Sequence, residues 1–319
     1  MMTTYNPRDI LAGTGILALF GAVALYFPIL GFACFLLLPL PMLLYRLKLG
    51  RKSAGIMAIL AVVVIQVSGP GHVVDLWLIL CMIGLGFAMA EALLQNLSVE
   101  KTIGYPGALI WTAGLAALLF IGSFSASGPL EMISEYVRRN LELTAATYET
   151  MEMPESSIRV LTESMDRIHY VIMGILPALT ASGLIFAGWA NLLIARAALR
   201  ARQLPEPAFG RLNLWKAPDA LVWAVIASAL LLWVASGPLA FMGANALILL
   251  MLIYLFQGIA VISWYFEQKQ MPLFLRVLIY VLIAIQQALA LVVIGLGFFD
   301  TWADFRKINA APGDHPDPS

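Results

Sequence analysis

The chain has 319 residues, of which 61% are hydrophobic and 12% are charged, and its mean hydropathy is +0.88. A soluble domain carries about 25% charged residues, so this composition excludes a soluble protein and predicts one embedded in a lipid bilayer. The 19 basic and 19 acidic residues cancel, and the basic ones are scattered through short loops. A nucleic-acid partner is excluded as well, because such proteins gather basic side chains on one face.

Two apolar segments of membrane-spanning length open the chain. Asn6 and Pro7 are typical of a helix start, with Asn6 as the cap and Pro7 at the first helical position. Because a second full-length segment follows directly, we expect the first to remain as an anchor rather than to be cleaved as a signal. Pro39 and Pro41 predict a kink or an interruption in the second. The two spans are expected at about 7–26 and 29–47.

Seven further apolar segments bring the predicted number of spans to nine, or to eight if one segment is misjudged. The third, 54–67, is short for crossing ~30 Å of hydrocarbon. The fold class is therefore all-α, a polytopic transmembrane helical bundle. The other spans are expected at about 75–94, 105–127, 169–195 and 220–235, with two more inside 243–300 that are separated by 267–272.

Residues 129–166 differ from the apolar segments around them. Leu130, Ile133 and Val137 recur at helical spacing while charged residues take the other side, which predicts an amphipathic helix outside the membrane. Pro154 is expected to start a second such helix, which continues into the sixth span.

The expected organisation has four parts: a six-span unit 1–200, a basic cytoplasmic linker 201–217, a three-span unit 218–305 and a disordered tail 306–319. Most of the 19 basic residues fall in loops on the N-terminal side of the membrane. The positive-inside rule then places the N-terminus in the cytoplasm, so we expect a multi-pass protein of the bacterial cytoplasmic membrane. With nine spans, the linker lies inside and Arg306 lies outside.

Polar side chains inside the predicted spans are the candidate ligand-binding residues, because an intramembrane polar group needs a partner. Glu91 is the one carboxylate well inside a predicted span; its alternative is an interfacial position where its charge reaches water. The amides either line a ligand cavity or form hydrogen bonds between helices, which contribute about 0.6 kcal/mol on average. The candidates are Gln66, Glu91, Asn191, Asn245, Tyr254, Gln257, Gln286 and Gln287.

Two small residues of the fourth predicted span are candidates for contacts between helices. Gly84 and Ala88 share a helical face with Glu91 and are candidates for close helix contacts.

No Ser/His/Asp constellation, phosphate loop or pair of catalytic carboxylates appears, so no catalytic residue and no enzymatic activity are predicted. The histidines and cysteines form no cluster with ligand spacing, so no metal site and no cofactor are expected. A small-molecule ligand and a membrane-protein partner remain open.

Three sequence blocks resemble the YybS-like family of bacterial membrane proteins. The first is Leu38 to Pro41 with the basic residues after it, and the second is Asn213 to Asp219. The third and most specific contains Asn245, Gln257-Gly258 and a stretch from 297 to 307. The resemblance implies a polytopic membrane fold and brings no established activity with it.

More distantly, residues 1–200 are similar in layout to the S components of energy-coupling-factor transporters and to the cell-shape protein MreD. In S components an Ala-x-x-x-Ala face meets a membrane partner, and Ala18 and Ala22 have that spacing here. The S-component likeness implies binding of a small or lipid-like ligand for transport. The alternative, implied by the MreD likeness, is a non-enzymatic scaffold of an envelope or cell-shape complex. The three spans after residue 215 depart from the six-helix pattern.

Overall fold

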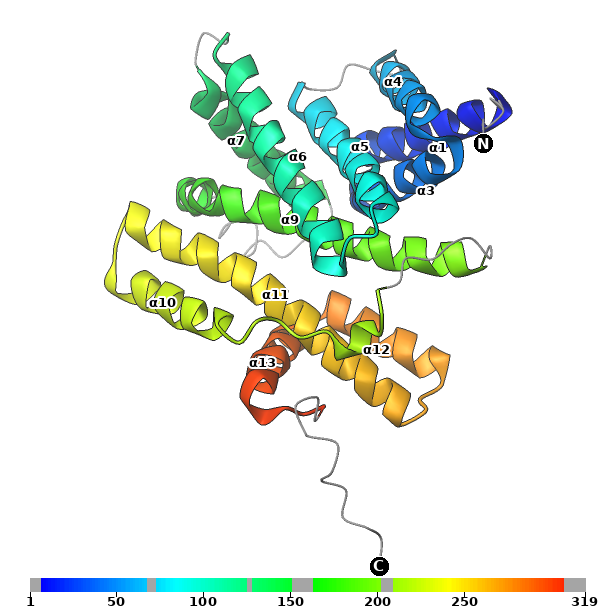
Figure 1. Ribbon diagram of the computed structural model, residues 1–319. Helices are drawn as coiled ribbons and strands as arrows, with labels where there is room; N and C mark the ends of the chain where they lie inside the picture. The colour runs from blue at the N-terminus through cyan, green and yellow to red at the C-terminus, as the bar shows by residue number, and fades with distance from the viewer. Residues whose placement is uncertain (1–6, 68–72, 125–127, 151–162, 202–208, 307–319) are drawn as a thin grey trace, which may run out of the picture. The chain divides into compact units, whose positions relative to one another are not determined.

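The computed structural model describes residues 7–67, 73–124, 128–150, 163–201 and 209–306, and every regular element in these ranges is a helix (Figure 1). The predicted all-α, polytopic membrane fold is confirmed. The chain divides into two compact units, Met1–Ala208 and Phe209–Ser319. The division falls inside the segment that the sequence predicts as a linker.

The first unit is a bundle of helices with closely packed pairs. In it, α1 packs against α2 and α4, α3 packs against α5, and α6 packs against α5 and α9. Gly86 allows two backbones to approach closely, because a Cβ there would lie 2.3 Å from the carbonyl oxygen of Pro39. The helices are α1 (Pro7–Tyr26), α2 (Pro28–Leu37), α3 (Pro39–Leu49), α4 (Arg51–Val67), α5 (Val73–Leu94), α6 (Val99–Gly122), α7 (Pro129–Thr150) and α9 (Met165–Ala201).

The predicted interruption of the second span lies at Leu38, between α2 and α3. Pro39 has no N–H to continue the helical ladder, so the carbonyls of the preceding turn need other donors. The Leu36 carbonyl accepts a hydrogen bond from Nδ2 of Asn191 at 2.7 Å. A side chain of α9 therefore bonds to the backbone at the break.

Helix α7 is the predicted amphipathic helix, and it packs against α6 and α9. Tyr136 donates to Oδ1 of Asp75 at 2.6 Å, and Ser134 contacts the ring of His169 at 3.2 Å. Burial, and then the bond to Asp75, raise the pKa of the Tyr136 phenol, so it stays a neutral donor. The start of the second predicted amphipathic helix, at Pro154, lies outside the described residues.

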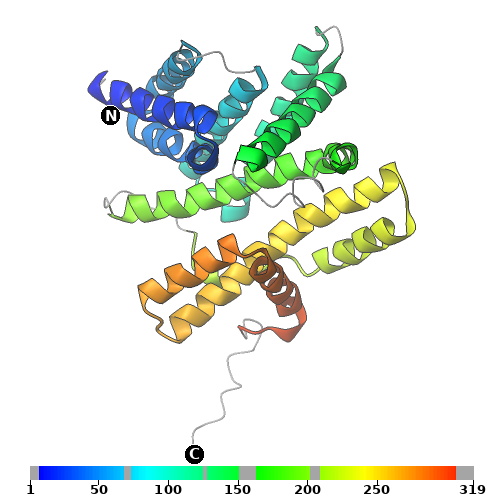
Figure 2. The same ribbon diagram turned by 180° about the vertical axis from the view of Figure 1, so that it is seen from behind.

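The second unit is built on one long helix, α11. A short turn at 235–237 joins α10 to α11, and these two helices pack side by side (Figures 1 and 2). Helix α13 crosses α11 at Gly258 and Gly297, where added Cβ atoms would lie 2.0 Å from the Val293 carbonyl oxygen and 2.1 Å from that of Tyr254. The elements are η1 (Leu212–Leu214), α10 (Leu221–Val234), α11 (Pro238–Gln268), α12 (Leu273–Ile285) and α13 (Gln287–Ala303).

The last predicted span is broken in two. The chain bends by 105° between α12 and α13, and Gln286 at the bend has an extended backbone with φ −96° and ψ 103°. Gln286 and Gln287 are exposed at this break. The bend turns α13 so that its small residues reach α11, and this tertiary contact is not visible in the apolar pattern of the segment.

Six described helices are long and apolar enough to span a membrane, or seven if α12 and α13 form one broken span. The nine predicted spans exceed this number for physical reasons that differ by segment. Helix α10 has 14 residues, about 21 Å of length, and α4 has 17 with two basic residues at its start. Helix α10 is therefore shorter than the ~30 Å hydrocarbon core. Helix α4 is also short, and its first turn is charged.

Candidate functional site

Gln257 and Asp300 join α11 to α13 through a buried hydrogen bond. Nε2 of Gln257 donates to Oδ2 of Asp300 at 3.0 Å, and the two residues are 0% and 1% exposed. Oε1 of Gln257 accepts from the backbone N–H of Ala217 at 3.1 Å. One buried amide therefore links three segments: the chain before α10, the middle of α11 and the end of α13.

Arg306 completes this buried network. Its Nη2 donates to Oδ2 of Asp300 at 2.7 Å, and its Nη1 donates to the carbonyl oxygens of Asn213 and Trp215 at 2.8 and 2.9 Å. The backbone N–H of Phe305 donates to Oδ1 of Asp300 at 3.1 Å. Buried charges persist only when they are paired and hydrogen-bonded in this way, although Nε of Arg306 has no partner among the described residues.

The position of Arg306 corrects two expectations. The sequence places this residue at the start of a disordered tail and on the opposite side of the membrane from the linker. Instead it is 4% exposed and contacts the backbone of Asn213 and Trp215, so the end of α13 and the chain before α10 lie together. The opposite placement is wrong. Residues 307–319 lie outside the described part of the chain.

The segment before α10 runs back along the last turns of α11. Arg211 pairs with Glu267 at 2.8 Å, Asn213 also donates to Glu267, and Ala217 reaches Gln257 about three turns earlier. Part of the expected linker is therefore a packed strip on α11. The strip fixes where α10 begins.

Helix α11 is longer than the hydrocarbon core of a membrane. At 1.5 Å per residue, the 31 residues of α11 extend roughly 46 Å, well beyond the ~30 Å of hydrocarbon. Starting from Pro238, about 30 Å of helix ends near Gln257. The exposed Arg211 and Glu267 then lie beyond the hydrocarbon, where surface charges are solvated.

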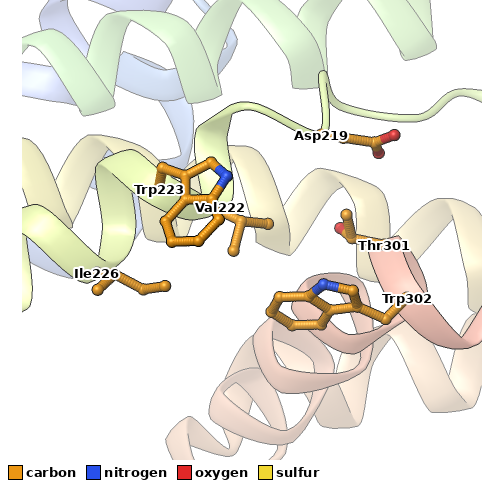
Figure 3. Close-up of a pocket in the computed structure, with 6 residues that line it drawn as sticks. All are labelled: Asp219, Val222, Trp223, Ile226, Thr301 and Trp302. Carbon is orange, nitrogen blue, oxygen red and sulfur yellow. The ribbon is translucent and has the colours of Figure 1, made fainter.

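A cavity of about 280 Å³ opens beside this network, between the first turns of α10 and the last turn of α13 (Figure 3). Trp223 and Ile226 line it from α10, and Thr301 and Trp302 line it from α13 (Figure 3). The remaining lining residues are Asp219 and Val222. The volume is slightly below that of a typical small-molecule pocket, so it fits a head group rather than a large ligand.

The buried Tyr254 and the half-buried Phe298 support the α13 side of the cavity. Phe298 contacts Trp302 edge to face with ring centroids 5.0 Å apart, and Tyr254 packs against Phe298 at 5.1 Å. Tyr254 is 0% exposed, and its hydroxyl approaches the Thr301 side chain without a well-formed hydrogen bond. Trp302 is thus oriented by a row of rings that begins inside α11.

Glu91, the leading candidate in the first unit, is engaged in an ion pair. Oε1 of Glu91 accepts from Nε and Nη2 of Arg46 at 2.9 and 2.6 Å, and Nε of Arg51 lies 3.7 Å away. The Arg46 guanidinium also lies 5.5 Å from the Phe87 ring centroid. The arrangement ties α3 to α5, a structural role for Glu91 that the sequence left open.

The remaining polar candidates do not gather at one site. Asn191 is 0% exposed and donates to Leu36 and to Ala187, while its Oδ1 has no partner among the described residues. Asn245 donates to Phe241 within its own helix. Gln66, Gln286 and Gln287 are exposed.

The small-residue candidates lie at helix contacts to different degrees. Ala18 is 8% exposed and Ala22 is half-buried, so Ala18 is covered within its own unit. A Cβ at Gly84 would lie 3.0 Å from Ile110, which places this residue at the contact between α5 and α6. Ala88 on the same helix is half-buried.

Sequence reasoning missed most of the residues around the cavity. In the sequence, Asp300 lies one helical turn from Asp304, a spacing that suits a cation, a pair with Lys307 or a solvated helix end, and nothing there marks Trp223 or Trp302. The sequence contains one signal for this site. The blocks 213–219 and 297–307 both carry the family resemblance, and the Gln257 network brings them together in the fold. Among the described residues no group of three or more His, Cys, Asp or Glu is placed to hold a metal ion.

Comparison with known proteins gives one match. No curated protein and no solved structure matches the chain, so the likeness to S components and MreD stays a prediction. A family described as "Predicted membrane protein (DUF2232)" matches residues 15–301, which cover most of both units and the buried network except Phe305 and Arg306. The chain belongs to the DUF2232 family of predicted membrane proteins.

Proposed function

We propose that this membrane protein binds a small, lipid-like molecule at the cavity between α10 and α13. The observation that carries the proposal is the pairing of an open cavity with a buried polar network that holds both of its sides. Ala217 fixes the chain before α10 and Asp300 fixes the end of α13, and both bond to Gln257. Buried polar groups in membrane proteins commonly mark functional sites.

The position of the cavity supports an amphiphilic ligand. Trp223 and Trp302 lie at helix ends, where tryptophan is enriched at membrane interfaces. An amphiphile there keeps its polar head beside Asp219 and Thr301 and its apolar part in the hydrocarbon. A site at this level is open to molecules that arrive through the bilayer.

We propose further that binding serves transport, with the first unit acting in the manner of an S component, and that the protein has no enzymatic activity. The N-terminus would lie in the cytoplasm of a bacterial cell, as the distribution of basic residues favours. These proposals rest on the sequence pattern and the helical layout. The transported molecule is identified only by its lipid-like chemistry.

Native mass spectrometry of the gently purified protein tests the binding proposal. We expect an adduct of lipid-like mass on the wild type that is reduced in Trp302→Leu and kept in Trp233→Leu, whose side chain is 84% exposed at the other end of α10. Equal adducts in all three proteins would contradict the proposed site. A protein free of adducts, with no thermal shift across a broad lipid and metabolite screen, would contradict ligand binding altogether.

A scaffold role is the second candidate, and α7 is the observation that favours it. Leu130 and Leu143 are 70% and 56% exposed on this amphipathic helix, which offers apolar contacts to a protein partner. Site-specific crosslinking from Leu143 in cells should then give one discrete protein adduct. Only heterogeneous or lipid adducts would contradict the scaffold role.

A further inference from the structure

The cavity between α10 and α13 has the side chains of a cation site. Trp223 and Trp302 are 73% and 60% exposed and face the opening from different helices (Figure 3). Asp219 lies at the edge of the cavity beside Thr301, which contributes a hydroxyl (Figure 3). Indole faces attract cations, and ammonium ligands are recognised by such aromatic groups together with a carboxylate.

The neighbouring charges favour the same ligand. Lys216 pairs with Asp219 at 3.0 Å, but Lys216 does not line the cavity and Asp219 does. The Lys216 side chain is 18% exposed and that of Asp219 is 69% exposed, so the pair is partly open to solvent, and solvent screening weakens such pairs. A ligand cation is therefore able to compete with Lys216, whereas an anionic head group would meet the Asp219 carboxylate.

A third feature is the apolar path that leads away from the carboxylate. Val222 is buried at the cavity, and Ile226 lies one turn further along α10 with 47% of its surface exposed. An alkyl chain placed along this side of α10 stays in contact with apolar side chains while its head remains at the rim. The cavity thus separates a polar end from an apolar end.

We propose that this cavity binds the positively charged ammonium head of an amphiphile between Trp223 and Trp302, with Asp219 as the counter-charge. The proposal rests on the ligand-binding function proposed above and adds the chemistry of the head group. The Thr301 hydroxyl oxygen accepts a hydrogen bond from a head that carries an ammonium N–H, and Ile226 contacts the chain. Lys216 acts as the resident cation that the ligand replaces.

Retention of a set of matched probes by the full-length protein in neutral maltoside micelles tests this inference. The probes are octyltrimethylammonium, octyl sulfate and tetramethylammonium, and native mass spectrometry measures the bound fraction of each. We expect octyltrimethylammonium to bind about tenfold more tightly than octyl sulfate. Tetramethylammonium, which lacks the chain, should bind more weakly than the octyl compound.

Variants separate the cation site from general apolar binding. Trp302→Leu and Asp219→Asn should each weaken octyltrimethylammonium binding by about tenfold, and Trp233→Leu should leave it unchanged. Lys216→Gln should strengthen it several-fold because the carboxylate loses its resident partner. Far-ultraviolet circular dichroism and the thermal midpoint of each variant confirm that it is folded.

The outcomes of the probe and variant experiments distinguish a wrong head group from the absence of a binding site. Sulfate binding equal to or tighter than ammonium binding, or weaker ammonium binding in Lys216→Gln, would overturn the assignment of a cationic head. If octyl sulfate or the neutral detergent is retained and is lost in Trp302→Leu, the site stands and only the head group is wrong. If no probe is retained by the folded wild type, the proposed ligand-binding function fails together with this inference. Equal binding of tetramethylammonium and octyltrimethylammonium would overturn the proposal that the ligand is an amphiphile.

Discussion

Gln257 on α11 and Asp300 on α13 share a hydrogen bond of 3.0 Å in a part of the protein that solvent does not reach. Neither residue is close to the other in the chain, and each has further partners: Ala217 for the amide, and Arg306 and Phe305 for the carboxylate. This pair is the centre of the C-terminal unit. It connects the chain before α10 to the end of α13, and the candidate cavity lies between those two segments.

Removing the charge of Arg306 should destabilise the C-terminal unit. In Arg306→Met the Asp300 carboxylate stays buried without its counter-charge, and such losses cost about 3–5 kcal/mol. Thermal or denaturant unfolding in detergent, followed by near-ultraviolet circular dichroism, measures the change. The matched control is Arg211→Met, because its pair with Glu267 is exposed and screened by solvent, so its loss should change stability far less. Equal stability of the two variants would contradict the structural role of Arg306.

The crossing of α11 and α13 predicts strong intolerance of a methyl group at Gly297. A Cβ there would lie 2.1 Å from the Tyr254 carbonyl oxygen and 2.6 Å from the Gly258 nitrogen, so the helices must separate. Overpacking costs about 1–3 kcal/mol, and backbone neighbours cannot move aside as side chains do. Gly295→Ala is the control, since nothing lies within 4 Å of its Cβ. Comparable thermal midpoints for Gly295→Ala and Gly297→Ala would argue against the close crossing.

Glu91→Gln tests the ion pair of the first unit. Arg46 is 6% exposed and keeps its charge after the change, so we expect a loss of about 1.5–3 kcal/mol in stability. The double variant Arg46→Met/Glu91→Gln should recover part of this loss, because the unpaired buried charge is then gone. Lys48→Met, which breaks the exposed pair with Asp9, is the control. An unchanged stability with a lost cellular function would instead favour a direct functional role for Glu91.

Docking of α7 should depend on the Tyr136 hydroxyl. The contribution of this hydroxyl should stay constant as the pH changes near neutrality. In Tyr136→Phe the hydrogen bond to Asp75 is lost, and hydrogen exchange of α7 backbone amides should become faster. Because the pKa of Tyr136 is raised in the folded state, the bond contributes fully below the unfolded value of about 10 and weakens only as pH rises above it. A difference in exchange protection between the wild type and Tyr136→Phe that shrinks between about pH 6 and 8 would contradict this account.

The sequence predicts the helical class and the approximate positions of most helices because both depend on local information. Pro39 predicts the break at Leu38, and the apolar spacing of 129–141 predicts α7. These features follow from backbone chemistry and from the period of the helix. They need no knowledge of which helices meet.

The site depends on contacts between distant segments and is therefore harder to predict. Gln257 was singled out because an amide inside an apolar segment needs a partner, but its partners come from 40 and 43 residues away. Asp300 and Arg306 read as the end of a helix and the start of a tail when taken alone. Gln286 and Gln287 satisfied the same polar criterion as Gln257, yet a bend of 105° places them at an exposed break. Only the crossing of α11 and α13 distinguishes the two cases.

Photo-crosslinking with a diazirine-bearing alkylammonium is the most direct test of the proposed site. The probe is added to the full-length protein in native membranes, and the labelled peptides are mapped by mass spectrometry. The account predicts labels on 222–226 and on Thr301 or Trp302, with competition by octyltrimethylammonium and loss in Trp302→Leu. Labels spread evenly over the lipid-facing helices, unchanged by competitor and by Trp302→Leu, would contradict it.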